Sequence, residues 1–178
     1  MLAVVCSYIN PDLDGVACSI ALGILGHPKW SARILGKIDA ETSIVLRDLG
    51  FTCPPPVVEW DTVDEIWLVD THHPSQLPQD LPDSRVIQIT DHHPGGNPSR
   101  YANADVQNEE VGAAATLVAE RFQKLGAAIP VSVAILLQAA IVSNSLNFQA
   151  PATSHRDRNA YAILQTIKPL QETLFDHM

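Results

Sequence analysis

Apolar and polar residues form blocks along the chain whose lengths suit strands and helices in turn. Three short runs rich in β-branched and aromatic residues predict buried strands over residues 4–8, 65–70 and 85–90, and residues 32–37 are a further candidate. Longer runs predict helices over residues 16–25, 40–50, 111–125, 132–143 and 156–168. Gly50 stands where a helix commonly ends.

The alternation of predicted strands and helices determines the expected fold class. It predicts an α/β fold, a doubly wound and mostly parallel sheet with helices on both faces. The 178 residues contain no internal repeat, no low-complexity tract and no linker of the kind that separates domains. We therefore expect a single domain over residues 1–178, which is long enough to bury a core.

Charge and composition narrow the possible partners and the location. A formal net charge of −9 gives no basic surface for counterion release, so nucleic acid is an unlikely partner. The N-terminal apolar run has no basic segment before it and is interrupted at Pro11, which is typical of neither a signal peptide nor a membrane span. Cys6, Cys18 and Cys53 are widely spaced and predict buried, reduced thiols. A cytoplasmic protein without a membrane contact is the expectation.

Three of the predicted strands end in acidic or imidazole side chains. These side chains are Asp12 and Asp14, then Asp70, then Asp91, His92 and His93. In open parallel sheets the ligand crevice lies beyond the carboxyl ends of the strands, so we expect these groups to converge. Carboxylate and imidazole donors without a thiolate favour Mn²⁺, Co²⁺ or Mg²⁺ over structural zinc. The pattern predicts one metal or phosphate site.

Each of these side chains also has a plainer interpretation. Asp14 stands just before a helical pattern and could cap that helix. Asp70 could be a solvated strand end, and the histidine pair could be a hydrogen-bonded turn. Arg100, Arg156 and Arg158 could contact phosphate or could be solvated surface charges.

Five segments, in their order along the chain, resemble the DHH phosphoesterase superfamily. They are Asn10-Pro11-Asp12-Leu13-Asp14, Val69-Asp70, Asp91-His92-His93, residues 109–116 and residues 141–148. Within that superfamily the chain is most similar to the N-terminal domain of manganese-dependent (family II) inorganic pyrophosphatases, and Ala40-Glu41-Thr42 is a further likeness. The resemblance runs from residue 4 to the C-terminus. The chain stops about where the second domain of such relatives would begin.

The resemblance implies a metal-dependent phosphohydrolase with an activated water. The implied substrates are pyrophosphate, a short polyphosphate as in exopolyphosphatases, or a small phosphodiester, and the implied cofactor is Mn²⁺, or Mg²⁺ or Co²⁺, as one or two ions. The implied ligands are Asp12 for one ion, Asp14 and His92 for the other, Asp70 bridging both, and Asn144 at a further ligand position.

The remaining residues of the triad have implied roles as well. The resemblance implies that His93 is the proton donor and that Asp91 orients the imidazoles. It also implies a homodimer. A nuclease acting on single strands is less favoured, because no basic groove is visible in the sequence.

Two positions depart from the pyrophosphatase pattern. Tyr8 stands where those enzymes carry a histidine, and Asn144 stands where they carry an aspartate. A phenol with a pKa of about 10 is a poor ligand at neutral pH, and an amide supplies only an uncharged oxygen. His72 and His73 are candidate replacement ligands. The departures favour an alternative, a catalytically degraded module of the DHH fold that binds a phosphorylated ligand or a partner chain.

Overall fold

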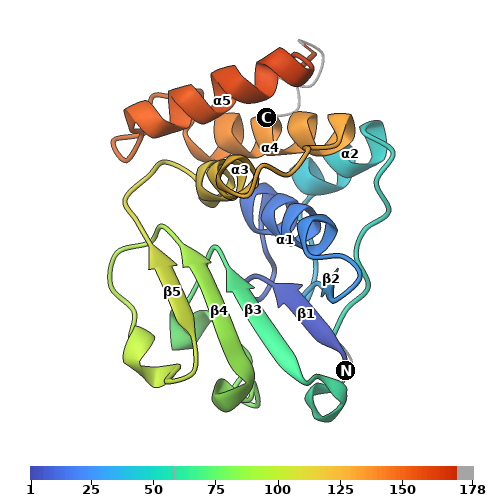
Figure 1. Ribbon diagram of the computed structural model, residues 1–178, viewed down its shortest axis with the longest axis vertical. Coiled ribbons are helices and arrows are strands. Elements are labelled where there is room, and N and C mark those ends of the chain that lie inside the picture. Colours follow the sequence, from blue (N-terminus) through green and yellow to red (C-terminus); the bar gives the residue numbers. More distant parts are fainter. Residues whose placement is uncertain (58, 172–178) are drawn as a thin grey trace.

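The computed structural model describes residues 1–57 and 59–171 and contains one parallel sheet. Its strands are β1 (Ala3–Cys6), β2 (Trp30–Ala32), β3 (Glu65–Val69), β4 (Val86–Asp91) and β5 (Asp105–Asn108). Their order across the sheet is β2-β1-β3-β4-β5, and every neighbouring pair is parallel (Figure 1). The strand order reverses between β1 and β3, and ligands of open α/β sheets bind at such a reversal.

In the part of the chain that the structure describes, five α-helices lie on one side of the sheet (Figure 1). They are α1 (Leu13–Leu25), α2 (Ala40–Asp48), α3 (Ala114–Lys124), α4 (Val131–Asn144) and α5 (His155–Ile167). α1 and α3 contact the strands directly, while α4 contacts α1, α3 and α5. Because α4 has neighbours on several sides, its central residues 133–142 are all buried, as its almost wholly apolar sequence predicts.

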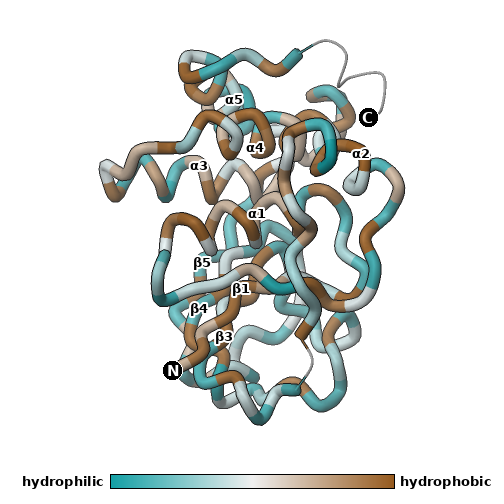
Figure 2. The backbone as a smooth tube through the Cα atoms, turned by 90° about the vertical axis from the view of Figure 1, so that its right-hand side faces the viewer, coloured by the Kyte–Doolittle hydropathy of each residue, from teal (hydrophilic) through white to brown (hydrophobic). Residues whose placement is uncertain are grey.

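The opposite face of the sheet has a different cover. Short 3-10 helices occur in the segments that lead into β3, β4 and β5. They are Trp60–Thr62, Pro74–Gln76, Asp83–Arg85 and Pro98–Arg100. Leu77 and Tyr101, which follow two of these turns, pack with Val4, Leu68 and Ile89 in a second core. Both faces of β1 and β3 are therefore buried, which explains their continuous apolar runs (Figure 2). The predicted α/β class and parallel sheet are confirmed, and the helices on the second face are of the 3-10 kind.

Two strands differ from the sequence-based expectation. β2 begins at Trp30, and residues 33–37 leave the sheet apart from an isolated bridge between Leu35 and Ile9 and one between Ile34 and Pro56. β5 was not predicted, because its sequence is mostly polar and the strand is largely exposed at the sheet edge. Gly50 follows α2 with a φ of +72°, as expected at a helix end.

Two further expectations concern the burial of the cysteines and the absence of a membrane span. Cys6 and Cys18 are buried free thiols, whereas Cys53 is free and exposed, so the expectation that all three are buried was wrong for Cys53. Cys53 lies in a proline-rich loop and not in an apolar run. Within the described residues, no helix is both long and apolar enough to span a membrane.

Candidate metal centre

Asp12 and Asp14 lie in the turn from β1 into α1. Asp12 caps the helix, because its Oδ1 accepts hydrogen bonds from the N–H groups of Asp14 (3.0 Å) and Gly15 (3.2 Å). Asp14 is therefore inside the first turn and is not the cap. Its two carboxylate oxygens accept the N–H groups of Ala114 at 2.7 Å and Ala115 at 2.9 Å, at the start of α3. The N-terminus of α3 thus holds a carboxylate that is only 1% exposed.

Asp70 directly follows β3 and is buried at the carboxyl edge of the sheet. Its backbone is left-handed, with a φ of +61°, and its N–H donates to the Thr90 carbonyl of β4 at 2.9 Å. Its Oδ1 is buried without a hydrogen-bond partner. Burial raises the pKa of Asp70 to about 6, although the neighbouring His92 opposes the shift. A buried carboxylate oxygen without a donor is costly, and a cation would remove that cost.

His92 presents one ring nitrogen to these carboxylates. Its Nδ1 donates to the Val111 carbonyl at 2.8 Å, which leaves Nε2 facing the site. Nε2 lies 3.2 Å from Asp70 Oδ1 and 4.0 Å from Asp14 Oδ2, and it has no hydrogen-bond partner. Ligand atoms that share one ion at about 2.1 Å lie roughly 3 to 4 Å apart. The distances from Nε2 to each of the two carboxylate oxygens are therefore those expected for pairs of ligands on one cation.

The pKa values of this cluster indicate that its side chains hold protons which a bound cation would displace. Burial lowers the pKa of His92, but the carboxylates of Asp70 and Asp14 outweigh it and raise that pKa to about 9. Burial, followed by the charge of Asp70, raises the pKa of Asp14 well above its usual value, and Asp12 adds to the shift. The cluster on its own therefore holds protons that a divalent cation would displace.

Asp91 is a fully buried acceptor for several donors at the end of β4. Its Oδ1 accepts the N–H groups of His92 (2.7 Å) and His93 (3.1 Å) and the Nδ1 of His93 (2.9 Å), and its Oδ2 accepts the Nδ1 of His72. Burial opposes ionisation, but the bonds from His93 and His72 lower the pKa of Asp91 to about 2. Asp91 therefore holds the rings of His93 and His72, whereas Val111 holds the ring of His92.

One group of possible metal ligands stands out among the residues the structure describes. Asp70, His92 and His93 each offer an atom within 4.8 Å of the others. Asp14 adjoins this group through its contact with His92. The imidazole of His93 is 45% exposed, so a substrate can reach it.

Tyr8 and Asn144 make other contacts. The Tyr8 hydroxyl accepts the N–H of Asp12 at 3.1 Å, and burial together with the charge of Asp12 raises its pKa, so the phenol stays neutral. Asn144 ends α4 and donates its Nδ2 to the Gly112 carbonyl at 2.8 Å. In the described part of the chain no hydrogen bond joins Asn144 to the acidic cluster. Its role as a ligand stays a prediction.

The proposed replacement of lost ligands by His72 and His73 was wrong. His72 Nδ1 is bonded to Asp91, and its Nε2 lies 2.8 Å from the Gly95 carbonyl, so neither nitrogen is free for an ion. His73 is exposed, and its Nδ1 accepts hydrogen bonds from Ser75.

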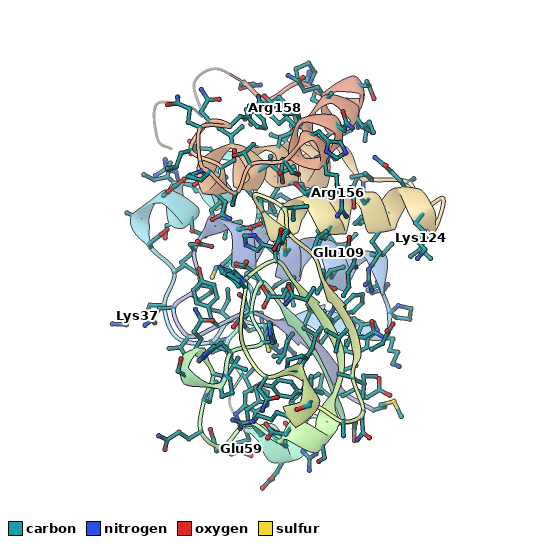
Figure 3. All side chains as sticks on the ribbon, turned by 90° about the vertical axis from the view of Figure 1, so that its left-hand side faces the viewer. Lys37, Glu59, Glu109, Lys124, Arg156 and Arg158 are labelled. Atoms are coloured by element: carbon teal, nitrogen blue, oxygen red, sulfur yellow. The ribbon has the colours of Figure 1, made fainter. Side chains whose placement is uncertain are left out.

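The three arginines considered for phosphate contact are bonded elsewhere. Arg156 forms ion pairs with Glu109 at 2.7 Å and Glu120 at 2.5 Å, and Figure 3 shows it beside Glu109. Arg100 and Arg158 bond to other groups at the surface. With these three arginines engaged, cations would have to offset the charge of a bound phosphate.

Sequence reasoning missed the segment over residues 111–115 as a support of the site. The Val111 carbonyl holds His92, and the Gly112 N–H donates to Asp157 of α5 at 2.8 Å. Asp157 is fully buried and also accepts hydrogen bonds from Thr116 at 2.6 Å and from Ser154. The Ser154-x-x-Asp157 spacing is a capping-box pattern and was the available signal.

Known proteins resemble this chain along most of its length. A "probable manganese-dependent inorganic pyrophosphatase" of Deinococcus radiodurans is 30% identical over 170 residues, which are 94% of this chain and 54% of that protein. The manganese-dependent inorganic pyrophosphatase of Methanothrix thermoacetophila is 30% identical, over 86% of this chain and 50% of its own length. The chain thus spans about half the length of the curated relatives it matches.

Solved structures agree with that likeness. The crystal structure of a candidate family II inorganic pyrophosphatase from Methanococcus jannaschii has a TM-score of 0.79 and 28% identity, covering 99% of this chain and 60% of that one. An exopolyphosphatase-related protein from Bacteroides fragilis shares the fold, with a TM-score of 0.78 at 13% identity over 99% of this chain and 55% of its own. The sequence pattern described as "DHH family, N-terminal domain" matches residues 3–141. The chain therefore belongs to the DHH family.

Proposed function

We propose that this chain is a Mn²⁺-dependent phosphohydrolase that acts on a phosphoanhydride, such as pyrophosphate or short polyphosphate, or on a small phosphodiester. The observation that carries the proposal is the buried pair of Asp70 Oδ1 and His92 Nε2, 3.2 Å apart and both without a hydrogen-bond partner. The relatives named as manganese-dependent pyrophosphatases support the choice of ion and substrate.

The donor set fits a hard or intermediate divalent cation. Asp14, Asp70 and His92 would hold it, and Asp12 would serve a second ion or a bound water. Carboxylates and one imidazole without a thiolate suit Mn²⁺, Co²⁺ or Mg²⁺. When bound, such an ion neutralises phosphate charge and activates a water for in-line attack.

His93 would supply the proton that the leaving oxygen needs. Its Nδ1 is bonded to Asp91 at 2.9 Å, so its other nitrogen, Nε2, is left for a substrate. The same bond raises the pKa of His93 above its usual value, which favours the protonated form near neutral pH. Asp91 thereby sets the orientation of the proton donor.

A second candidate is a DHH-fold module that binds a phosphorylated ligand or a partner chain without turnover. Two observations favour this candidate. The Tyr8 phenol beside Asp12 is neutral, and the Asn144 amide donates a hydrogen bond to the Gly112 carbonyl. The single-domain organisation, the cytoplasmic location and the homodimer expected from the sequence stay predictions.

Phosphate release from pyrophosphate, tripolyphosphate and a dinucleotide, with and without Mn²⁺, separates the two candidates. Asp70→Asn is the matched inactive variant, and Asp80→Asn, at an exposed residue, is the control. Release that needs both Mn²⁺ and Asp70 supports the hydrolase. Pyrophosphate binding without release from any substrate supports the module, and neither binding nor release overturns both.

A further inference from the structure

We propose that His72 is a positioning residue that fixes the imidazole of His93 by holding the opposite side of Asp91. The kinetic part of this inference rests on the proposed phosphohydrolase function. The structural part does not, because it concerns which nitrogen of His93 carries a proton.

The local backbone directs His72 into the protein. Asp70, which directly follows β3, has a left-handed backbone with a φ of +61°, so the extended strand ends there. His72 is then only 1% exposed although it lies in a loop, whereas the adjacent His73 is exposed. A buried histidine in a loop requires partners for both of its ring nitrogens.

Both partners of His72 lie on the segment that carries His93. Its Nδ1 is bonded to Asp91 Oδ2, and its Nε2 lies 2.8 Å from the Gly95 carbonyl. These contacts fall two residues before and two residues after His93. The buried imidazole of His72 therefore contacts the chain both before and after His93, the proposed proton donor.

The loop after His93 is shaped around the His72 ring. Gly95 and Gly96 have φ values of +84° and +75°, and a Cβ on Gly96 would lie 2.1 Å from His72 Nε2. Only a glycine lets the backbone pass this close to the ring. The approach leaves the ring little freedom to turn away from Asp91.

The two carboxylate oxygens of Asp91 accept hydrogen bonds from different donors. Oδ1 accepts the backbone N–H groups of His92 and His93 and the Nδ1 of His93, while the bond from His72 is the one recorded for Oδ2 in the described residues. Without His72, Oδ2 would be buried and unpaired, and the carboxylate would turn to find a donor. Its bond to His93 Nδ1 would weaken, and His93 would lose the fixed arrangement that leaves Nε2 for the substrate.

Metal binding does not depend on the nitrogens of His72. Because both nitrogens of His72 are engaged, His72 offers no ligand atom to an ion. Loss of His72 should therefore change the state of His93 and the rate of turnover without changing the affinity for Mn²⁺.

Two conservative substitutions separate the contacts of His72. The Asn side-chain amide in His72→Asn can reproduce the Nδ1 donor to Asp91, whereas the longer side chain in His72→Gln reaches the Nε2 position near Gly95. His73→Asn and His73→Gln, at the exposed neighbour, are the matched controls.

The decisive readout is the tautomer of His93, measured from long-range ¹H–¹⁵N couplings in the full chain with Mg²⁺, which is diamagnetic. At a pH high enough to make the His93 ring neutral, we expect its remaining proton on Nδ1 in the wild type and in His72→Asn, and a loss of this preference in His72→Gln. A wild-type His93 with its proton on Nε2 alone, or His72→Gln with an unchanged tautomer, overturns the proposal.

Turnover of pyrophosphate with Mn²⁺ provides the second readout. We expect His72→Gln to lower kcat by about 10- to 100-fold, the range for residues that orient a functional group, with KM and Mn²⁺ affinity unchanged. His72→Asn should recover most of kcat. Equal losses in the two variants, or a loss of Mn²⁺ affinity, overturn the positioning role. If the wild type releases no phosphate, the proposed function fails, and the tautomer measurement still decides the role of His72.

Discussion

His92 Nε2 lies 3.2 Å from Asp70 Oδ1, and neither of these buried atoms has a hydrogen-bond partner. The ring of His92 is held through its Nδ1 by the Val111 carbonyl, and the backbone N–H of Asp70 donates to the Thr90 carbonyl. The imidazole nitrogen is therefore prearranged for a cation, since little freedom of the His92 ring remains to be lost on binding.

Replacement of Asp70 tests this arrangement. Asp70→Asn keeps the size of the side chain but removes the charge that faces His92, so we expect Mn²⁺ affinity to fall by at least about 100-fold, the upper range for residues that only support ligands. Titration calorimetry measures the loss, with Asp80→Asn as the control. An affinity within threefold of the wild type, about 0.7 kcal/mol, would show that Asp70 is not a ligand.

The pKa values predict a pH dependence of metal binding. The pKa of His92 is raised to about 9 and that of Asp70 to about 6, so between these values the metal-free site carries a proton on His92 that the ion must displace. Affinity for Mn²⁺ should therefore rise at least about tenfold per pH unit from about pH 6 to 9, more steeply wherever Asp14 also holds a proton, and then level off. Calorimetry in buffers of different ionisation enthalpy counts the released proton. A pH-independent affinity would contradict the proton competition.

Tyr8 and Asn144 can be tested together as weakened ligands. In Tyr8→His with Asn144→Asp, the new carboxylate faces the Gly112 carbonyl and should turn away from it, because two acceptors repel. We expect the number of bound Mn²⁺ ions or their affinity to increase, with faster phosphate release. Calorimetric stoichiometry is the measurement. If binding and release stay at the wild-type level, these two positions are not ligand positions.

Asp157 should stabilise the segment that holds His92. In Asp157→Ala the buried donors of Gly112, Ser154 and Thr116 lose their acceptor, and buried unpaired groups cost about 1–3 kcal/mol each. We expect the free energy of unfolding in urea to fall by about 3 kcal/mol, with Asp61→Ala, at an exposed residue, as the control. A loss below about 1 kcal/mol would mean that other groups hold this segment.

The convergence of the site could be predicted from sequence, because it follows from strand ends. Asp70 directly follows β3 and His92 directly follows β4. Parallel strands bring their carboxyl ends to one edge of the sheet, so these two residues are expected to lie close together. The burial of helix α4 could also be predicted, since a run of apolar residues without a polar face predicts burial on all sides.

Contacts between distant segments could not be predicted in this way. Asp14 accepts N–H groups from Ala114 and Ala115, and a single sequence contains no signal for this pairing across about a hundred residues. His72 and His73 are adjacent and identical in type, yet one is buried and the other is exposed. Strand β5 lacked the apolar pattern because it lies at the exposed edge of the sheet.

Metal-dependent hydrolysis is tested by measuring phosphate release from pyrophosphate as Mn²⁺ is added back to the metal-stripped chain, with Mn²⁺ occupancy measured on the same sample. We expect release to rise in proportion to occupancy and Asp70→Asn to abolish both. Release without Mn²⁺, or full Mn²⁺ occupancy without release from pyrophosphate, tripolyphosphate or a dinucleotide, would contradict metal-dependent hydrolysis.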